Sequence, residues 1–345
     1  MDPAFCALER RSSLRTAVIG QDFPESFGTF ICTALERMGH ESKLFRSPGS
    51  LIVFNRYVEL ATRLVLTNSR KALEAFERNM ARRILEWEAD LVISTDINLL
   101  PQTVRELKKA GIAVVAWCPD ALVNFGRQLF YIAPYDRIFL KDPYVCRHAQ
   151  EFGGLPVEYL PEACDPLVHR PVEPDEAARR AYGCDIIHYG NAYPSKVVFL
   201  ERLAAQGYSL KLYGRGFPAW LSTPLSSVWQ RKFLAGEEKA KALRAAKICL
   251  NPLHYGEIEG ANARLFESSG CGAFQLVEWR RSMEELFEHG SEVVYYQSYS
   301  ELLKLIEYWL PRDEERRAIG DAAARRAHRD HTYEKRLQRL LERTF

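Results

Sequence analysis

The sequence has almost no net charge. Its 345 residues carry 47 lysines and arginines against 45 aspartates and glutamates, which gives a formal net charge of +2. A nearly neutral chain produces no global field that would attract nucleic acid or anionic lipid, so charge indicates neither as a partner. Partners have to be inferred from local sites.

Long apolar runs are also missing. No run approaches the roughly 18 residues that a membrane-spanning helix needs. The start, MDPAFCALERRSSLR, has neither a long apolar core nor a small-residue cleavage pattern, so we interpret it as neither a signal peptide nor an anchor. We therefore expect a cytoplasmic protein whose only membrane association would be peripheral.

Metal-binding and disulfide patterns are absent as well. The eight cysteines form no C-x-x-C, and several lie in apolar segments such as KICLNP, which indicates buried thiols in a reducing compartment. His328 and His331 lie three positions apart near the C-terminus. Because no third ligand follows at metal spacing, a surface pair is the favoured interpretation.

Short apolar strands alternate with helical patterns in the first half of the chain. The strand LRTAVIG is followed by a helical pattern that closes at Gly39, and by the strand SKLFR. Residues 57–87 carry apolar side chains at helical spacing. The strands DLVIST, IAVVAWC and DRIFLK follow, together with the helical patterns PQTVRELKKAG and PYVCRHAQEFGG. This alternation predicts parallel strands joined by crossover helices.

A boundary follows near residues 165–183, because residues 160–185 hold four prolines and many charges between periodic segments. The alternation then restarts with IIHYGN, SLKLYG, ICLNP, AFQLVE and EVVYY as strands. We predict an α/β protein of two doubly wound domains, residues 1–168 and 169–325, with ligands bound beyond the carboxyl ends of the strands in the cleft between the domains.

The tail, residues 312–345, is helical in pattern and mixes ten basic with seven acidic residues. A nucleic-acid arm would carry mostly one sign of charge, so a salt-bridged helix is favoured. We expect residues 326–345 to pack back on the body as a C-terminal helix.

The stretch EIEGANARLFESSGCGA, residues 257–273, carries the most chemical information. A helix begins near Asn262 after the strand ICLNP, and its unsatisfied N–H groups and dipole favour a phosphate. Glu267 lies between one and two turns into this helix, where its carboxylate can accept two hydrogen bonds from a ribose diol. Glu259 precedes the helix and could reach a sugar. Alternatively, Arg264 and Glu267 form an exposed i, i+3 pair, and Glu259 is a solvated loop acid.

This stretch resembles the Glu-x7-Glu motif of glycosyltransferases with the two-domain GT-B fold. The wider run LNPLHYGEIEGANARLFESSGCGAFQLVE is similar to the CgeB-like branch, the spore-maturation-protein type of group 1 glycosyltransferases. Three segments agree in order and spacing: DRIFLKDPYVCRHAQEFGGLPVEYLPEACDPLVHRP, CDIIHYGNAYPSKVVFLERL and LKLYGRGF. The resemblance covers roughly residues 90–340.

The resemblance implies an enzyme that moves a sugar from a nucleotide-sugar donor, with a UDP-sugar expected first. Protein, glycan, lipid and nucleobase acceptors all stay open. No cofactor or metal is expected, because in this fold a helix dipole and basic side chains neutralise the leaving diphosphate. The sequence also has no D-x-D, the motif that the metal-dependent single-domain glycosyltransferase fold would predict.

The resemblance also assigns site residues. Glu267 is expected at the ribose hydroxyls and Glu259 at the donor sugar. The other residues expected to bind the donor or line its cleft are Gly190, Asn191, Lys196, Tyr213, Gly214, Asn262, Ala263 and Arg264. His254, in the loop before the acid pair, is either a donor contact or a loop histidine with a local hydrogen bond.

A base from the first domain is expected to activate the acceptor in many such transfers. Asp22 in GQDF and Asp120 in WCPDAL occupy loops at strand ends, and Asp96 in STDIN is a third candidate. Each could equally be a turn-forming or helix-capping aspartate. An enzyme that retains the anomeric configuration would need no single base.

Other functions predict features that the sequence does not have. A nicotinamide-dependent dehydrogenase predicts G-x-G-x-x-G after the first strand, where this chain has GQDFPESFG. A two-domain solute-binding protein predicts a secretion signal. A nucleotide-sugar epimerase of the same fold stays open.

Overall fold

The computed structural model of the chain describes residues 13–47, 64–191, 193–214, 217 and 222–345. It divides into two compact units, Met1–Pro161 with Tyr333–Phe345, and Glu162–Thr332. We call them the first and the second domain. The chain passes between them after residues 161 and 332, whereas the sequence placed the boundaries after residues 168 and 325.

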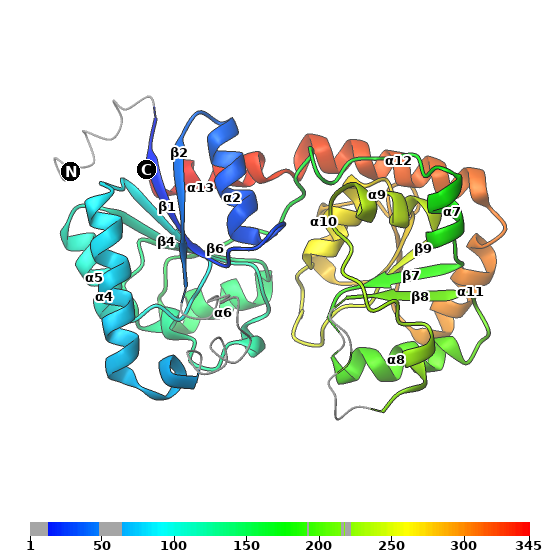
Figure 1. The fold of residues 1–345 in the computed structure, drawn as a ribbon, viewed down its shortest axis with the longest axis horizontal. Helices are drawn as coiled ribbons and strands as arrows, with labels where there is room; N and C mark the ends of the chain where they lie inside the picture. The colour runs from blue at the N-terminus through cyan, green and yellow to red at the C-terminus, as the bar shows by residue number, and fades with distance from the viewer. Residues whose placement is uncertain (1–12, 48–63, 192, 215–216, 218–221) are drawn as a thin grey trace. The chain divides into compact units, whose positions relative to one another are not determined.

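The first domain is built on a parallel sheet with the strand order β2-β1-β3-β4-β5-β6 (Figure 1). Side chains alternate between its faces, so that Ala17 and Ile19 pack on one side and Val18 on the other. The described strands are β1 (Arg15–Gly20), β2 (Glu41–Arg46), β3 (Leu91–Ser94), β4 (Ala113–Cys118), β5 (Arg137–Leu140) and β6 (Val157–Tyr159).

Helices cover both faces of this sheet, which explains why its inner strands β1, β3, β4 and β5 are nearly continuous apolar runs. One face carries α4 (Arg70–Glu86), α5 (Pro101–Lys109) and α6 (Pro143–Gly153), and the other carries α2 (Phe27–Arg37) and α13 (Tyr333–Thr344). The short 3-10 helices η2 (Leu122–Asn124) and η3 (Leu129–Tyr131) follow β4. The first part of the helical segment predicted over 57–87, residues 57–63, lies outside the described residues.

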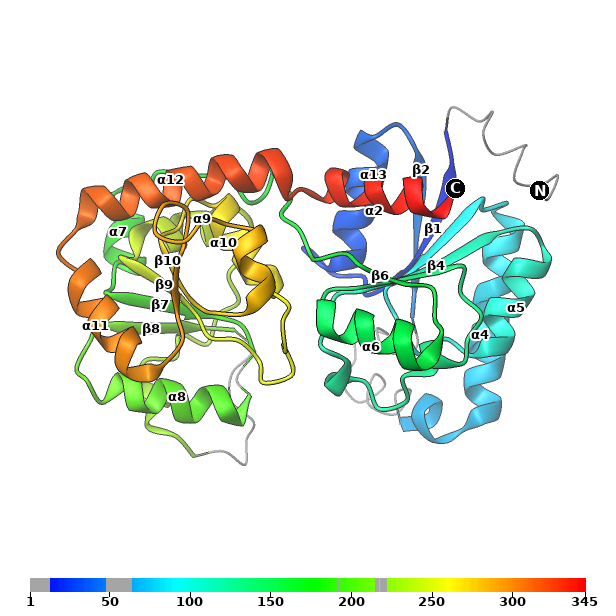
Figure 2. The ribbon, with the colours of Figure 1, turned by 180° about the vertical axis from the view of Figure 1, so that it is seen from behind.

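The second domain has a parallel sheet with the order β11-β10-β9-β7-β8 (Figures 1 and 2). Helices α8 and α11 pack on one face, and α9, α10 and α12 on the other. The strands are β7 (Ile186–Tyr189), β8 (Leu210–Tyr213), β9 (Ile248–Asn251), β10 (Gln275–Glu278) and β11 (Val294–Tyr296). The helices are α7 (Glu176–Tyr182), α8 (Pro194–Ala204), α9 (Gly236–Ala245), α10 (Ala263–Gly270), α11 (Tyr299–Trp309) and α12 (Asp313–Asp330), with the 3-10 turns η4 (Pro224–Ser227) and η5 (Arg281–Glu285).

Three local features differ from the sequence expectations. The proline-rich boundary contains a helix, α7, because the carboxylate of Asp175 accepts a hydrogen bond from the Ala178 amide at 2.8 Å and caps the first turn. The short strand β6 extends the first sheet beyond β5. The segment SMEELFEHG lies between the predicted strands AFQLVE and EVVYY, where the alternation of strands and helices predicts a helix, but it forms only the short 3-10 turn η5.

The tail consists of two helices with a break at His331 and Thr332. The His331 side chain is buried, its Nε2 lies 2.7 Å from the Leu286 carbonyl oxygen, and its own carbonyl accepts a hydrogen bond from the Cys164 amide at 2.9 Å. These contacts stop α12, and α13 then packs on the first domain. The interpretation of His328 and His331 as a surface pair is therefore wrong for His331.

Metal sites, membrane-spanning helices and disulfides are absent from the part of the chain that the structure describes. It contains no group of three metal-ligating side chains and no helix long and apolar enough to cross a membrane. No cysteine of this part forms a disulfide, and all of its cysteines except Cys32 are buried.

The aromatic contact that holds α13 on the first domain is testable. Tyr333 is 2% exposed, and its ring lies 5.1 Å from Phe30 and 5.7 Å from Phe27. We expect Tyr333→Ala to lower the free energy of unfolding by about 3–5 kcal/mol in urea, because it leaves a cavity. Phe152→Ala removes a ring that is 74% exposed and should change this value by less than about 0.5 kcal/mol. Equal losses in the two variants would contradict the docking role of Tyr333.

Candidate functional site

The order of strands in the second sheet reverses at β7. The chain continues from β7 to β8 on one side and later to β9 on the other. The loops that leave two such neighbouring strands diverge and form a crevice between them. In doubly wound sheets, ligands bind in this crevice, outside the carboxyl ends of the strands. The loop after β7 contains Gly190 and Asn191, and the loop after β9 leads into α10. The structure therefore brings the two predicted phosphate-binding segments to one edge of one sheet.

Two glycines allow the backbone to pack closely at this edge. Gly214 has φ +137°, and a Cβ there would lie 2.2 Å from the Gly190 carbonyl oxygen. Gly190 has φ +128°, and a Cβ there would lie 2.5 Å from an Arg264 guanidinium nitrogen. Only glycine fits at either position. The guanidinium consequently lies directly against the backbone of the turn after β7.

Arg264 is held in place by the end of β9. Its Nε donates to Asn251 Oδ1 at 3.1 Å and its terminal nitrogen donates to the Pro252 carbonyl at 3.3 Å. Asn251 in turn exchanges hydrogen bonds with Asn262, at 2.9 and 3.1 Å. The predicted helix start and the predicted cation thus belong to one network anchored on β9.

The start of α10 has hydrogen-bond donors available for an anion. Asn262 caps the helix through Oδ1, which accepts from the Leu265 amide at 3.2 Å. The amides of Ala263 and Arg264 have no acceptor among the described residues. An anion at this helix start would meet these two N–H groups, the positive end of the helix dipole and the Arg264 side chain.

A second cation lies nearby. Lys196, in the first turn of α8, is buried, with its ammonium 5.5 Å from the centre of the Tyr193 ring. Burial, with Arg264 and Lys196 close by, holds the pKa of His188 well below its usual value. With its pKa lowered in this way the ring is neutral at pH 7, and its Nδ1 donates to the Leu250 carbonyl at 3.0 Å. The positive charge of this edge therefore resides on Arg264 and Lys196.

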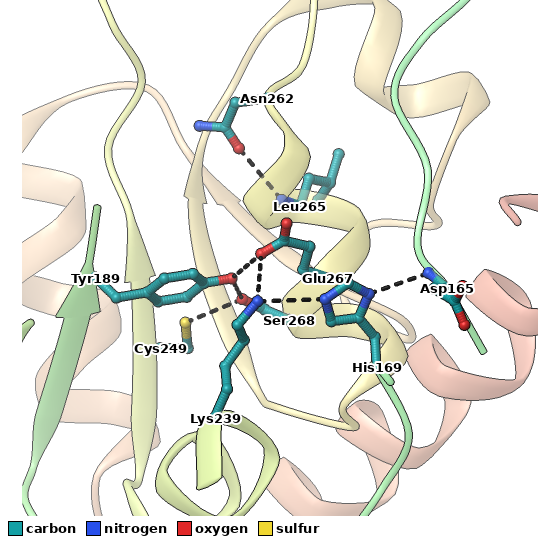
Figure 3. Close-up of polar contacts among 9 residues, drawn as sticks. All are labelled: Asp165, His169, Tyr189, Lys239, Cys249, Asn262, Leu265, Glu267 and Ser268. Atoms are coloured by element: carbon teal, nitrogen blue, oxygen red, sulfur yellow. Dashed lines mark hydrogen bonds and ion pairs between the residues drawn. The ribbon is translucent and has the colours of Figure 1, made fainter. Parts of the chain in front are cut away.

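Glu267 lies on α10 among polar groups from three other segments (Figure 3). Its Oε2 is 3.3 Å from Lys239 Nζ and 3.3 Å from the Tyr189 hydroxyl. Burial alone would raise the pKa of Glu267, but the ammonium of Lys239 lowers it to about 2. The exposed surface pair of Arg264 and Glu267 is not formed, because Arg264 bonds to Asn251 and Pro252 instead.

Three other residues predicted to contact the donor, His254, Glu259 and Tyr213, form hydrogen bonds with other parts of the protein. His254 is buried, and its Nδ1 accepts from the Gly256 amide at 3.1 Å, which is the local hydrogen bond that the sequence left as one alternative. Glu259 is partly exposed, and its carbonyl oxygen accepts from the Ser282 amide at 3.2 Å. The ring of Tyr213 is packed in the core, and its carbonyl oxygen accepts from the Gly190 amide at 3.0 Å.

The base candidates Asp22 and Asp120 of the first domain have local partners. Asp22 forms an exposed ion pair with Arg46 at 2.8 Å. Asp120 Oδ1 accepts from the Ala121 amide and from the Asn124 side chain, each at 2.8 Å, as a turn-capping aspartate does.

Asp96 has a different environment. The first sheet reverses at β1, with β2 on one side and β3 on the other, and Asp96 follows β3. Its Oδ1 accepts from the Asn98 amide at 2.9 Å, and burial raises its pKa. Glu77 of α4 is fully buried, and burial, with a smaller contribution from the nearby Asp96 carboxylate, raises its pKa to about 7.

Lys239 and Tyr189, which contact Glu267, and His169, which contacts Lys239, were not found from the sequence. Lys239 lies in EEKAKALRAAK, where its charge suggests a solvated helix face. His169 lies in the proline-rich boundary, and Tyr189 lies in a strand as an ordinary core residue. None of these patterns carries a local signal of the site, because the contacts join segments that are far apart in the chain.

The second domain has a family match. Residues 176–342 match the family model described as "Glycosyl transferase-like". The match begins with α7 and ends within α13. A comparison with curated proteins finds none that is similar in sequence.

Solved structures share the fold over 95% of the chain. The chain is similar to sucrose-phosphate synthase from Thermosynechococcus elongatus, with a TM-score of 0.64, 12% identity, and 95% of this chain and 98% of that chain covered. It is also similar to HepE from Anabaena in complex with UDP-glucose, with a TM-score of 0.63, 13% identity, and coverage of 95% and 98%. These similarities confirm the predicted GT-B fold. Together with the family match they support the predicted enzyme class, a glycosyltransferase.

The ionisation of Glu267 predicts a pH dependence of stability. A carboxylate whose pKa is depressed from 4.5 to about 2 stabilises the folded state above its unfolded pKa, and this contribution is lost as the pH falls toward 2. We expect Glu267→Gln to lower the free energy of unfolding by about 3 kcal/mol at pH 7. The difference from wild type should shrink when unfolding is followed from pH 5 down to pH 3. A difference that stays constant over this range would show that the carboxylate charge contributes nothing.

Proposed function

We propose that the protein is a glycosyltransferase that moves a sugar from a nucleotide-sugar donor to an acceptor without a metal cofactor. The observation that carries the proposal is the arrangement at the start of α10. Two open amide N–H groups, Arg264 and Lys196 gather at the same strand ends as Glu267. This set fits a diphosphate and the ribose diol of a single ligand.

The donor that we propose first is a UDP-sugar. The support is that HepE, which shares the fold, is solved in complex with UDP-glucose. We propose Glu267 as the ribose ligand and Glu259 as a donor-sugar contact, with Gly190, Asn191 and Lys196 near the phosphates. On the sequence segments, we also place the chain in the CgeB-like branch. Its acceptor is a protein, glycan, lipid or nucleobase.

The transfer step would exchange one bond for another at the sugar. The bond between the anomeric carbon and the diphosphate oxygen breaks, and its electron pair stays on the diphosphate. A bond from the same carbon to an acceptor oxygen or nitrogen forms. Arg264, Lys196 and the helix start would stabilise the charge that develops on the leaving diphosphate. The acceptor proton passes to a base in an inverting transfer, or to the leaving diphosphate in a retaining one.

An epimerase of the same fold is the second candidate. A putative UDP-N-acetylglucosamine 2-epimerase from Listeria monocytogenes is similar to the chain, with a TM-score of 0.55, 12% identity, and 96% of each chain covered. An epimerase changes the donor sugar without an acceptor, so product analysis in the absence of acceptor separates the two reactions.

The donor site predicts selective binding of one nucleoside diphosphate. We expect one of UDP, GDP, CDP, ADP and dTDP to raise the melting temperature of the wild-type protein in the presence of EDTA, because ligands that bind only the folded state stabilise it. Arg264→Gln should weaken this binding roughly 10- to 100-fold, since it removes a charged hydrogen-bond donor. Lys304→Gln, on the exposed face of α11, should leave the affinity unchanged. Stabilisation by NAD alone, or by no nucleotide, would contradict the proposed function.

A base role for a first-domain aspartate is separately testable. We propose Asp96 ahead of Asp22 and Asp120, because its pKa is raised and it has no arginine partner among the described residues. Asp96→Asn should slow inverting transfer, or the hydrolysis of a UDP-sugar, roughly 10²- to 10⁴-fold. The wild-type rate should rise with pH as this carboxyl ionises, and the variant should lose that rise. Asp22→Asn and Asp120→Asn serve as controls; a larger loss in either would overturn the order.

A further inference from the structure

The two oxygens of the Glu267 carboxylate have different surroundings (Figure 3). Oε2 is 3.3 Å from both the Lys239 ammonium and the Tyr189 hydroxyl. Oε1 has no hydrogen-bond partner among the described residues, and the Glu267 side chain is 15% exposed. One oxygen is therefore fixed by the protein, and the other is available to a ligand.

Lys239 is fixed in turn by the segment that precedes α7. The lysine side chain is only 4% exposed, and its Nζ lies 3.3 Å from His169 Nε2. His169 Nδ1 accepts a hydrogen bond from the Asp165 amide at 3.0 Å, so the neutral ring carries its proton on Nε2. A protonated Nε2 cannot accept from the ammonium. The ring therefore packs against Nζ without accepting from it, and the ammonium donates to Oε2 at 3.3 Å.

The His169 segment is itself packed against α10. A Cβ at Gly270 would lie 2.8 Å from the His169 carbonyl oxygen, so only glycine allows this approach. The same carbonyl lies 2.7 Å from His328 Nε2 of α12. Lys239 thus cannot move away from Glu267 without displacing a buried segment.

We propose that Lys239, backed by His169, is a positioning residue that presents Oε1 of Glu267 to the ribose diol of the donor. This inference rests on the proposed function. A positioning role differs from that of a purely structural ion pair. A change at Lys239 should alter the recognition of the ribose hydroxyls and leave the diphosphate contacts of Arg264 and Lys196 intact.

The test compares the ribo and 2′-deoxy forms of one nucleoside diphosphate, UDP first, by calorimetry. Wild type should bind UDP about 10-fold more tightly than 2′-deoxy-UDP, because the 2′-hydroxyl forms one hydrogen bond to a charged group and this factor is the affinity that one such bond contributes. Lys239→Met should lower the UDP affinity by about the same factor and bring the ratio close to one, with little change for 2′-deoxy-UDP. Lys241→Met is the matched control, because Lys241 lies on the same helix and pairs with Asp175 and Glu237.

The outcomes distinguish the two proposals. A Lys239→Met protein that keeps the wild-type ratio overturns the positioning role and leaves the proposed function standing. If no nucleoside diphosphate binds wild type, the proposed function fails and the inference fails with it. If Lys239→Met does not fold, Lys239→Met/Glu267→Gln removes both charges of the pair at once and is better tolerated. The ratio of UDP affinity to 2′-deoxy-UDP affinity in this double variant should equal the ratio in Glu267→Gln alone. A lower ratio would contradict the proposal that Lys239 acts through Glu267.

Discussion

The candidate site depends on the position of β7 between β8 and β9. Because the three strands are parallel, their carboxyl ends lie at one edge, and the chain leaves β7 and β9 in different directions. Gly214 then packs against the Gly190 carbonyl and Gly190 against Arg264, with no room for a Cβ at either glycine. The cation is therefore positioned both by the backbone of the turn after β7 and by its own hydrogen bonds to Asn251 and Pro252.

The charge of each buried ionisable group in the second domain depends on whether an oppositely charged group lies beside it. Glu267 stays ionised because Lys239 compensates for its desolvation, whereas His188 is buried near two cations and stays neutral. The result is a separation of function along α10. Positive charge and open N–H groups lie at its start, and a single carboxylate oxygen is available one turn further on. A ligand with a diphosphate and a diol matches this order.

Much of the fold was predictable from the sequence. Strands buried on both faces are short apolar runs, and the helices between them have clear amphipathic periods, so the parallel architecture follows from local patterns. The start of α10 and the position of Glu267 were predictable for the same reason, because a strand, a short loop and a helix are contiguous in the chain. Even here, the sequence could not tell an exposed Arg264–Glu267 pair from two residues with separate partners.

Only the tertiary structure decided what surrounds Glu267. Lys239, His169 and Tyr189 come from three segments; the contact of Lys239 with His169 spans 70 positions of sequence, and that of Tyr189 with Glu267 spans 78. Local patterns suggested a solvated helix, a linker and a core strand for these residues, because periodicity reports the exposure of a helix or strand face and carries no information on distant partners. The sequence by itself determined the elements, the parallel pairing and the helix start. Packing of the boundary segment against α10 determined which oxygen of the carboxylate is left available.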